Sequence, residues 1–219
     1  MSNGLNNLID KNTLTFLEGH AVTTALLGVS DHRPRLGVSN YDFVRSENHP
    51  TDQGVILLPF NDSLTDSAIS AYWLPQGSYI DVPITAPPAE FIFTPEFSGC
   101  KVYVDKVGGN YRIFHIQCPH EAVEYPENLR GERTATVDSR DYGGVPSVDG
   151  PAYPSRISET RCTVLLRFVK TENCWSIFLQ GLTGIGPGVS DGRLVYPPGP
   201  VQSVNGVTFK HVPIPAIAP

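Results

Sequence analysis

FIFTPEFSGCKVYVDKVGGNYRIFHIQCPH, residues 91–120, is the stretch around which the rest of the chain is predicted to fold. A short apolar strand leads through a proline into the small-residue turn at 98–100. Two segments that alternate with period two follow, 101–107 and 111–117, and the Gly-Gly pair between them is a β-hairpin signal. The sequence therefore predicts a hairpin that carries a cysteine at its entry and a histidine near its end.

The register of this hairpin decides which side chains meet. With the two glycines as the turn, Cys100 and His115 fall on one face of the hairpin as diagonal neighbours. A shift by one residue would move His115 to the opposite face. The unshifted register is favoured because it places an opposite-charge pair and an aromatic pair directly across the ladder, namely Asp105 with Arg112 and Tyr103 with Phe114.

A thiol beside an imidazole is the minimum that thiol nucleophilic catalysis needs. The imidazole can lower the thiol pKa and later move a proton, so Cys100 and His115 form a candidate catalytic pair. The turn residues Ser98 and Gly99 could point backbone N–H groups at a developing oxyanion. The competing interpretation is structural, because a cysteine is often a buried small hydrophobe and a strand histidine is often simply hydrogen-bonded.

The turn also carries a family resemblance. Phe97-Ser98-Gly99-Cys100, with a histidine fifteen residues on, resembles the Leu-Ser-Gly-Cys motif and following histidine of bacterial toxin glutamine deamidases. These are the cytotoxic necrotizing factor catalytic domain and Burkholderia lethal factor. Phe97 departs from the usual leucine. Thr94 resembles the position whose backbone carbonyl orients the histidine in the lethal factor, and the chain length is also similar to that free-standing toxin.

The resemblance implies a bacterial toxin or effector that deamidates one glutamine of a host protein in the host cytosol, without a cofactor. Cys100 would attack the carboxamide, His115 would transfer protons, and the Thr94 carbonyl would orient the imidazole. The lethal factor acts on the DEAD-box translation initiation helicase, which is the favoured target. The alternatives are deamidation or transglutamination of Rho-family GTPases, cysteine protease chemistry, or a non-enzymatic β-sandwich used for binding or adhesion.

Composition narrows the remaining possibilities. The net charge is −6 without a cluster of Lys or Arg, which disfavours a nucleic-acid partner. The N-terminus lacks the basic and apolar regions of a Sec signal peptide, and no apolar run reaches the length of a membrane span. Delivery from a bacterium would therefore use another route. Twenty glycines and twenty prolines in 219 residues predict many short strands joined by loops.

The four cysteines give no zinc signal, because none of them forms a CxxC pair. Cys162 and Cys174 lie in later strand segments and are predicted to be core residues. A Cys100–Cys118 disulfide is disfavoured, because the predicted register places Cys100 opposite Gln117. His120 is a less favoured base than His115, because Pro119 takes it out of the strand ladder.

These patterns predict one domain over residues 1–219, an α/β fold in which a mixed or antiparallel β-sandwich is flanked by a few helices and long loops. Helices are expected over 5–20, 64–74 and near 124–131. Further strands are expected over 21–29, 35–44, 55–60, 79–84, 90–94, 160–170, 174–182 and 207–212. The irregular region 119–155 is hypothesised to wall the active cleft and select the substrate, a passive surface loop being the alternative.

Overall fold

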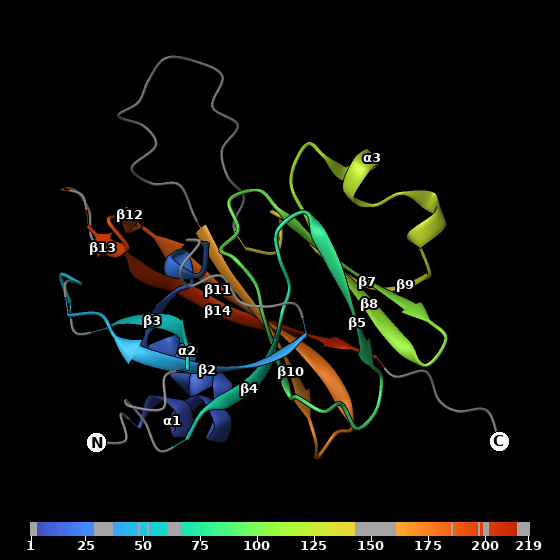
Figure 1. The fold of residues 1–219 in the computed structure, drawn as a ribbon, viewed down its shortest axis with the longest axis horizontal. Helices are drawn as coiled ribbons and strands as arrows, with labels where there is room; N and C mark the ends of the chain where they lie inside the picture. The colour runs from blue at the N-terminus through green and yellow to red at the C-terminus, as the bar shows by residue number, and fades with distance from the viewer. Residues whose placement is uncertain are drawn as a thin grey trace.

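Two β-sheets packed face to face dominate the molecule, which was analysed as a computed structural model (Figure 1). The structure describes residues 4–28, 37–47, 49–51, 53–60, 67–142, 161–184, 186–196, 198 and 202–213. One sheet has eight strands and the other has four. The predicted α/β class is confirmed, since the described residues form a mixed and antiparallel β-sandwich with few helices.

The eight-stranded sheet has the strand order β1-β3-β2-β4-β6-β10-β11-β14. Two of its pairings, β1 with β3 and β4 with β6, are parallel, and the others are antiparallel. Its strands are β1 (Ala21–Thr23), β2 (Val38–Arg45), β3 (Gly54–Pro59), β4 (Ile69–Trp73), β6 (Phe91–Phe93), β10 (Arg161–Val169), β11 (Cys174–Thr183) and β14 (Ser203–Val212).

The four-stranded sheet is antiparallel throughout, with the order β5-β8-β7-β9. It comprises β5 (Ser78–Pro83), β7 (Lys101–Val107), β8 (Asn110–Ile116) and β9 (Glu132–Val137). A separate two-stranded ribbon is formed by β12 (Gly188–Ser190) and β13 (Arg193–Val195).

The β7–β8 hairpin has the predicted register. Val107 pairs with Asn110, and the charge and aromatic pairs lie directly across the ladder, Asp105 with Arg112 and Tyr103 with Phe114. Gly108 adopts φ +59, the left-handed conformation that this tight turn requires. Val102 pairs with His115, so Cys100 and His115 share the face that looks toward the eight-stranded sheet.

Short helices cover parts of both sheets. The helix expected over 5–20 is two helices, α1 (Leu5–Lys11) and α2 (Thr13–Gly19), because Asn12 leaves the helical conformation and its side chain caps the second helix. The remaining helical turns are η1 (Ala25–Gly28), α3 (Glu121–Glu124) and η3 (Glu127–Leu129). Within the described residues, no helix is both long and apolar enough to cross a membrane.

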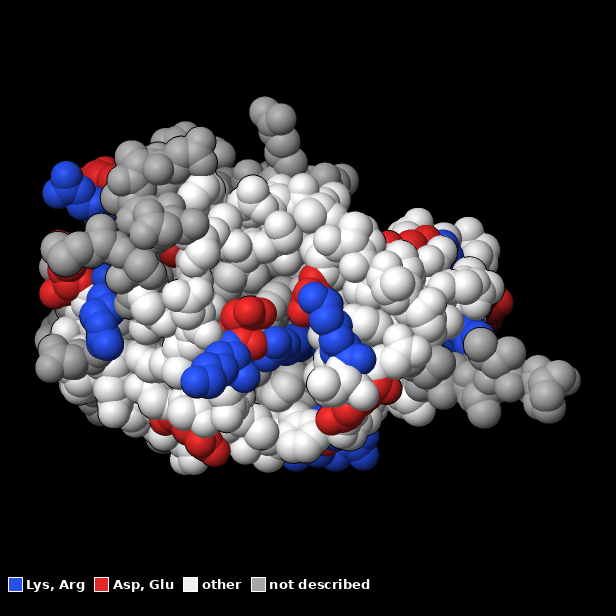
Figure 2. Space-filling view, turned by 90° about the horizontal axis from the view of Figure 1, so that it is seen from below, with Lys and Arg blue, Asp and Glu red and all other residues white. Residues whose placement is uncertain are grey.

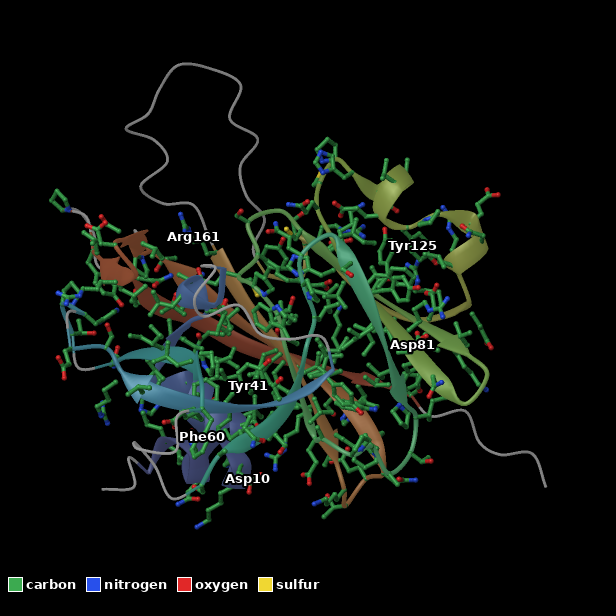
Figure 3. The ribbon with its side chains drawn as sticks, viewed as in Figure 1. Asp10, Tyr41, Phe60, Asp81, Tyr125 and Arg161 are labelled. Carbon is green, nitrogen blue, oxygen red and sulfur yellow. The ribbon has the colours of Figure 1, made fainter. Side chains whose placement is uncertain are left out.

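Two apolar cores follow from the period-two alternation of the long strands. Alternate residues of β10 and β11, such as Leu166 and Ile177, pack with Val104 and Ile113 between the two sheets. The opposite face of the eight-stranded sheet packs against α1 and α2. Tyr41, which Figure 3 labels beside β2, lies in this second core. The larger sheet therefore packs against other elements on both of its faces.

A third small cluster attaches the α3–η3 segment to the outer face of the four-stranded sheet. Asp105 is fully buried and accepts hydrogen bonds from the Tyr125 hydroxyl (2.6 Å), the Gly131 N–H (3.0 Å) and Nε of Arg133 (2.5 Å). Tyr125 lies over β7 and β9 in Figure 3. Although Asp105 faces Arg112 in the register, the side chain of Arg112 pairs with Asp81 instead.

Several expected elements differ from the structure. The helix predicted over 64–74 is wrong at 69–73, which form the strand β4, and residues 64–66 lie outside the described part of the chain. The predicted strand over 21–29 ends at Thr23 and gives way to η1. The irregular region 119–155 contains the strand β9, while its residues 143–155 lie outside the described part.

The surface carries both signs of charge. On the face shown in Figure 2, Lys and Arg side chains lie beside Asp and Glu side chains, with wide areas of other residues around them. Ion pairs among the described residues include Arg167 with Asp10 and Lys170 with Glu90.

Candidate functional site

Thr94 and His115 form the centre of the candidate site. Thr94 follows β6 and His115 lies on β8, and both side chains are completely buried where the two sheets meet. Oγ1 of Thr94 lies 2.6 Å from Nδ1 of His115 and 2.9 Å from the carbonyl oxygen of Leu74. The threonine hydroxyl, rather than its backbone carbonyl as the family resemblance implied, therefore contacts the imidazole.

This arrangement fixes the tautomer of His115. A carbonyl oxygen can only accept a hydrogen bond, so the single hydroxyl proton of Thr94 is donated to Leu74. Thr94 must then accept from His115, which places the imidazole proton on Nδ1. The lone pair of His115 is left on Nε2, and this buried atom has no hydrogen-bond partner among the described residues.

Burial also fixes the charge of His115. It lowers the pKa of this imidazole from 6.5 to about 3, because a protonated ring would lose its hydration between the sheets. The ring of Phe97 lies against it, with centroids 4.2 Å apart. His115 is therefore neutral at neutral pH, with an unpartnered basic nitrogen.

Cys100 lies at the entry of β7 on the same face as His115, directly beneath the surface. It is 5% exposed, and burial raises the pKa of its thiol. The backbone N–H of Ser98 and the side-chain amide of Gln76 lower this pKa in part, while the nearby Glu124 carboxylate and the Cys118 thiol raise it further. Since Nε2 of His115 has no partner, the two candidate catalytic groups do not form a hydrogen bond in this conformation.

Gln76 is a site residue that the sequence did not reveal. It lies in the turn between β4 and β5, and its Nε2 amide is 3.7 Å from Sγ of Cys100. Its neighbour Gly77 donates its backbone N–H to the carbonyl oxygen of His115, which joins this turn to β8. An amide donor beside the sulfur could also reach an oxygen on a carbon that is bonded to that sulfur.

The Ser98-Gly99 turn contributes less than expected. Gly99 has φ +100, so only glycine fits there without strain. Its N–H donates to the hydroxyl of Tyr142 (3.1 Å), and that hydroxyl donates to the carbonyl oxygen of Cys100 (2.9 Å). The Gly99 N–H is therefore not free to hold an oxyanion, whereas the Ser98 N–H lies toward the cysteine sulfur.

Residues of α3 and of the connection between β8 and α3 form a polar rim beside Cys100. Glu124 accepts the backbone N–H of Gln117 (2.6 Å), and its other carboxylate oxygen lies 3.5 Å from Nδ1 of His120. Cys118 and His120 are exposed. His120, the less favoured base, thus contacts Glu124, while His115 contacts Thr94.

The cysteines are all free thiols, so the Cys100–Cys118 disulfide is not formed. Cys162 is fully buried in the core between the sheets, as expected. Cys174 is not a core residue, because it lies half-buried at the start of β11 beside Glu172 and His211.

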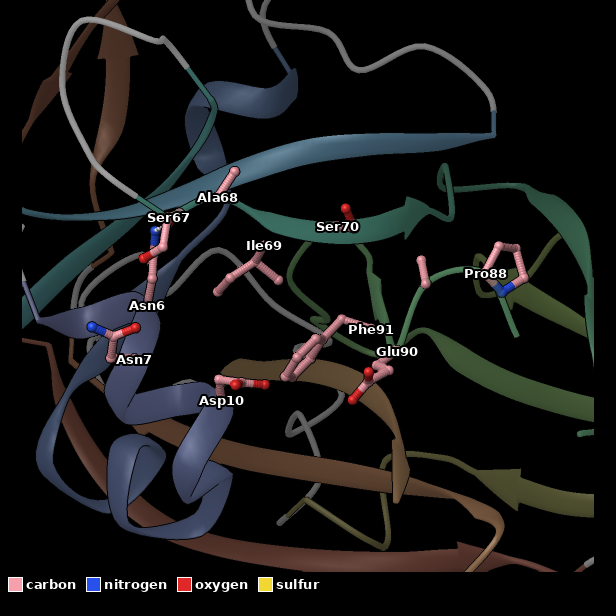
Figure 4. Close-up of a pocket in the computed structure, with 11 residues that line it drawn as sticks. Asn6, Asn7, Asp10, Ser67, Ala68, Ile69, Ser70, Pro88, Glu90 and Phe91 are labelled. Carbon is pink, nitrogen blue, oxygen red and sulfur yellow. Dashed lines mark hydrogen bonds between the residues drawn. The ribbon is translucent and has the colours of Figure 1, made fainter. Parts of the chain in front are cut away.

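A separate hollow of about 260 Å³ lies between α1, β4 and the start of β6 (Figure 4). Asn6, Asp10, Ser70 and Glu90 are among its lining residues. The Asn6 amide is occupied, since it donates to Asp42 and to the carbonyl oxygen of Ser67. Asp10 and Glu90 are also paired, with Arg167 and Lys170 respectively, so these polar lining groups already have partners.

The residues of the candidate site come from separate parts of the sequence. Cys100, His115, Thr94 and Ser98 were predicted from one continuous stretch, and the structure brings them together at the entry of the hairpin. Gln76, Glu124 and Tyr142 come from connections whose positions depend on the complete fold, and no local motif marks them. No protein-family model matches this chain, and no curated protein sequence is found to be similar to it.

Proposed function

We propose that this chain is a bacterial effector enzyme that deamidates a glutamine side chain of a host protein. Cys100 is the nucleophile, and His115 is the general base and acid. The observation that supports this most is the fixed Nδ1–H tautomer of His115, which leaves an unpartnered Nε2 on the face that also carries Cys100. A merely structural histidine would be expected to use both ring nitrogens when buried.

The reaction proceeds through a thioester. Sγ of Cys100 attacks the carboxamide carbon as its proton passes to Nε2 of His115. The oxyanion is held by the Gln76 amide and the Ser98 N–H, both of which lie toward the sulfur. His115 protonates the departing nitrogen, and ammonia leaves. Water then attacks the thioester as His115 takes its proton, and proton return restores the thiol and releases a glutamate side chain.

The electrostatics favour proton transfer during the attack over a preformed thiolate–imidazolium pair. Burial raises the pKa of Cys100 and lowers that of His115 to about 3, so both groups are neutral in the free enzyme. Substrate binding would have to bring Sγ and Nε2 into hydrogen-bond contact, as catalytic hydrogen bonds often tighten only in the substrate complex.

The favoured target is the DEAD-box translation initiation helicase, an expectation that rests on the resemblance at residues 91–120. A new glutamate in that helicase would block translation. A Rho-family GTPase is the alternative target, and deamidation there would lock the GTPase switch.

The test is to incubate eukaryotic cytosolic protein with wild-type chain, Cys100→Ser and Cys118→Ser, and to measure glutamine-to-glutamate conversion by peptide mass analysis. Conversion by the wild type and Cys118→Ser, but not by Cys100→Ser, is expected. The modified peptide names the target. Full activity of Cys100→Ser would contradict the mechanism. Cleaved peptides would indicate protease chemistry instead of deamidation, and amines cross-linked to glutamine would indicate transglutaminase chemistry.

A further inference from the structure

Three different metal-ligating side chains meet at the end of the eight-stranded sheet that lies farthest from Cys100. Glu172 is in the β10–β11 turn, Cys174 begins β11, and His211 is near the end of β14. The Cys100 turn is joined to β10 by the Phe97–Cys162 bridge, and Cys162 pairs with Gly181 on β11. At about 3.3 Å per residue, Gly181 is roughly 23 Å along the strand from Cys174.

The strand register brings these three side chains together. Cys174 and Ser176 lie on one face of β11 because strand side chains alternate, and Ser176 pairs directly with His211. Asn173 adopts φ +49, a left-handed conformation that makes the turn tight enough to place Glu172 beside Cys174. The sequence alone does not predict this group, because His211 lies 37 positions after Cys174 and no short motif connects them.

The distances within the group match the ligand triangle of a tetrahedral ion. Sγ of Cys174 lies 3.7 Å from Oε2 of Glu172 and 3.7 Å from Nδ1 of His211, and Nδ1 lies 3.5 Å from Oε2. Zinc bonds of about 2.3 Å to sulfur and about 2.1 Å to nitrogen or oxygen give tetrahedral edges of roughly 3.6 Å and 3.4 Å, respectively.

The three atoms also suit zinc chemically. A thiolate, an imidazole nitrogen and a carboxylate oxygen are the ligand types that Zn²⁺ uses in proteins. About half of the Glu172 side chain and half of the His211 side chain are exposed, at 53% and 49% respectively. A fourth position would therefore be open to water.

We propose that Glu172, Cys174 and His211 form a Zn²⁺ site with water as the fourth ligand. The ion joins the β10–β11 turn to the end of β14, which is the edge strand of the eight-stranded sheet. The same atoms are linked by hydrogen bonds, and Nδ1 of His211 also contacts the hydroxyl of Ser176 (3.1 Å). Zinc would replace the Ser176 contact at Nδ1.

The test uses the full chain, stripped with a chelator and titrated with Zn²⁺ alone, while zinc content and thermal midpoint are measured. One equivalent of zinc and a raised midpoint are expected for the wild type. Cys174→Ala and His211→Ala should each weaken binding by more than about tenfold and lose the thermal shift. Cys118→Ser, which removes an exposed cysteine elsewhere, is the matched control and should bind normally.

Cobalt supplies a second readout that does not depend on stability. Co²⁺ bound to a thiolate gives a sulfur-to-metal charge-transfer absorption, which should appear in the wild type, Cys118→Ser and Cys100→Ser but not in Cys174→Ala. Failure of the wild type to bind zinc would overturn the proposal and leave a hydrogen-bonded triad. Unchanged binding by Cys174→Ala would likewise overturn it, by locating the metal elsewhere.

Discussion

The Thr94 hydroxyl bridges the imidazole of His115 and the carbonyl oxygen of Leu74, at 2.6 Å and 2.9 Å. Thr94→Val keeps the shape of the side chain but removes both bonds and leaves two buried polar groups unpaired. We expect a loss of about 1–3 kcal/mol in the free energy of unfolding, and a fall in kcat on the order of 100-fold from the misoriented imidazole. Thr94→Ser should retain both properties.

These outcomes are measured by denaturant unfolding and by the rate of glutamine conversion. Nitrogen chemical shifts of His115 would report the tautomer directly, with the proton on Nδ1 in the wild type and in Thr94→Ser. A proton on Nε2 in the wild type would contradict the proposed base.

The Gln76 amide beside Cys100 is predicted to hold the oxyanion. Gln76 is exposed, so Gln76→Ala should leave stability nearly unchanged, within about 0.5 kcal/mol. Loss of one oxyanion donor typically lowers kcat by about 10²- to 10³-fold. Gln117→Ala, at a neighbouring amide on the rim, is the control. Equal kcat values for Gln76→Ala and wild type would show that the Gln76 amide does not stabilise the oxyanion.

The thiol of Cys100 should react slowly with iodoacetamide at neutral pH. Burial raises its pKa, so the thiol form persists to higher pH than in an exposed cysteine. Labelling of Cys100 should rise steeply with alkaline pH, and exposed Cys118 in the same protein provides the comparison. Fast, selective labelling of Cys100 at pH 7 would indicate a preformed thiolate and contradict the general-base mechanism.

His115 should make the fold sensitive to acid. Its pKa is lowered to about 3 in the folded protein from 6.5, so the unfolded chain binds a proton first as pH falls. The stabilisation is complete above pH 6.5 and is lost between there and pH 3, with a slope approaching 1.4 kcal/mol per pH unit. Urea unfolding of wild type and His115→Gln from pH 7 to pH 4 measures this pH-dependent loss of stability. Parallel pH profiles for the two proteins would show that His115 is not its source.

Asp105 should contribute far more to stability than Asp81, although both carboxylates pair with arginines. Asp105 is fully buried and ties Tyr125, Gly131 and Arg133 to the sheet. Asp105→Asn is expected to cost roughly 3–5 kcal/mol, whereas Asp81→Asn, at an exposed pair with Arg112, should cost about 0–1 kcal/mol. Similar losses in chemical denaturation would show that burial is not the cause.

The hairpin could be predicted from sequence because its information is local. The Gly108-Gly109 turn and the cross-strand pairs specify one register, and that register places Cys100 and His115 on one face. Thr94 came from a resemblance, which named the right residue but assigned the contact to its backbone carbonyl, whereas the hydroxyl makes it. Local pattern and the resemblance thus gave the candidate nucleophile and the candidate base, and left the hydrogen bonding to be determined by the fold.

Other parts depend on partners that are distant in sequence. Residues 69–73 were expected to be helical, yet Ile69, Ala71 and Trp73 alternate as in a strand, and parallel pairing with β6 decides the outcome. Gln76 and Glu124 reach Cys100 only because two connections converge there. The proximity of Glu172 and His211 follows from the β11–β14 register, which no short motif reveals.

Tyr142 anchors the turn at residues 98–100 from outside that segment of the chain. Its hydroxyl holds the Gly99 N–H and the Cys100 carbonyl, although it lies 42 positions after the cysteine. Shortened variants that test whether the 119–155 region selects the substrate must therefore retain Tyr142. A deletion that begins before it would release the turn, and a resulting inactive protein would be mistaken for one that had merely lost recognition of its target.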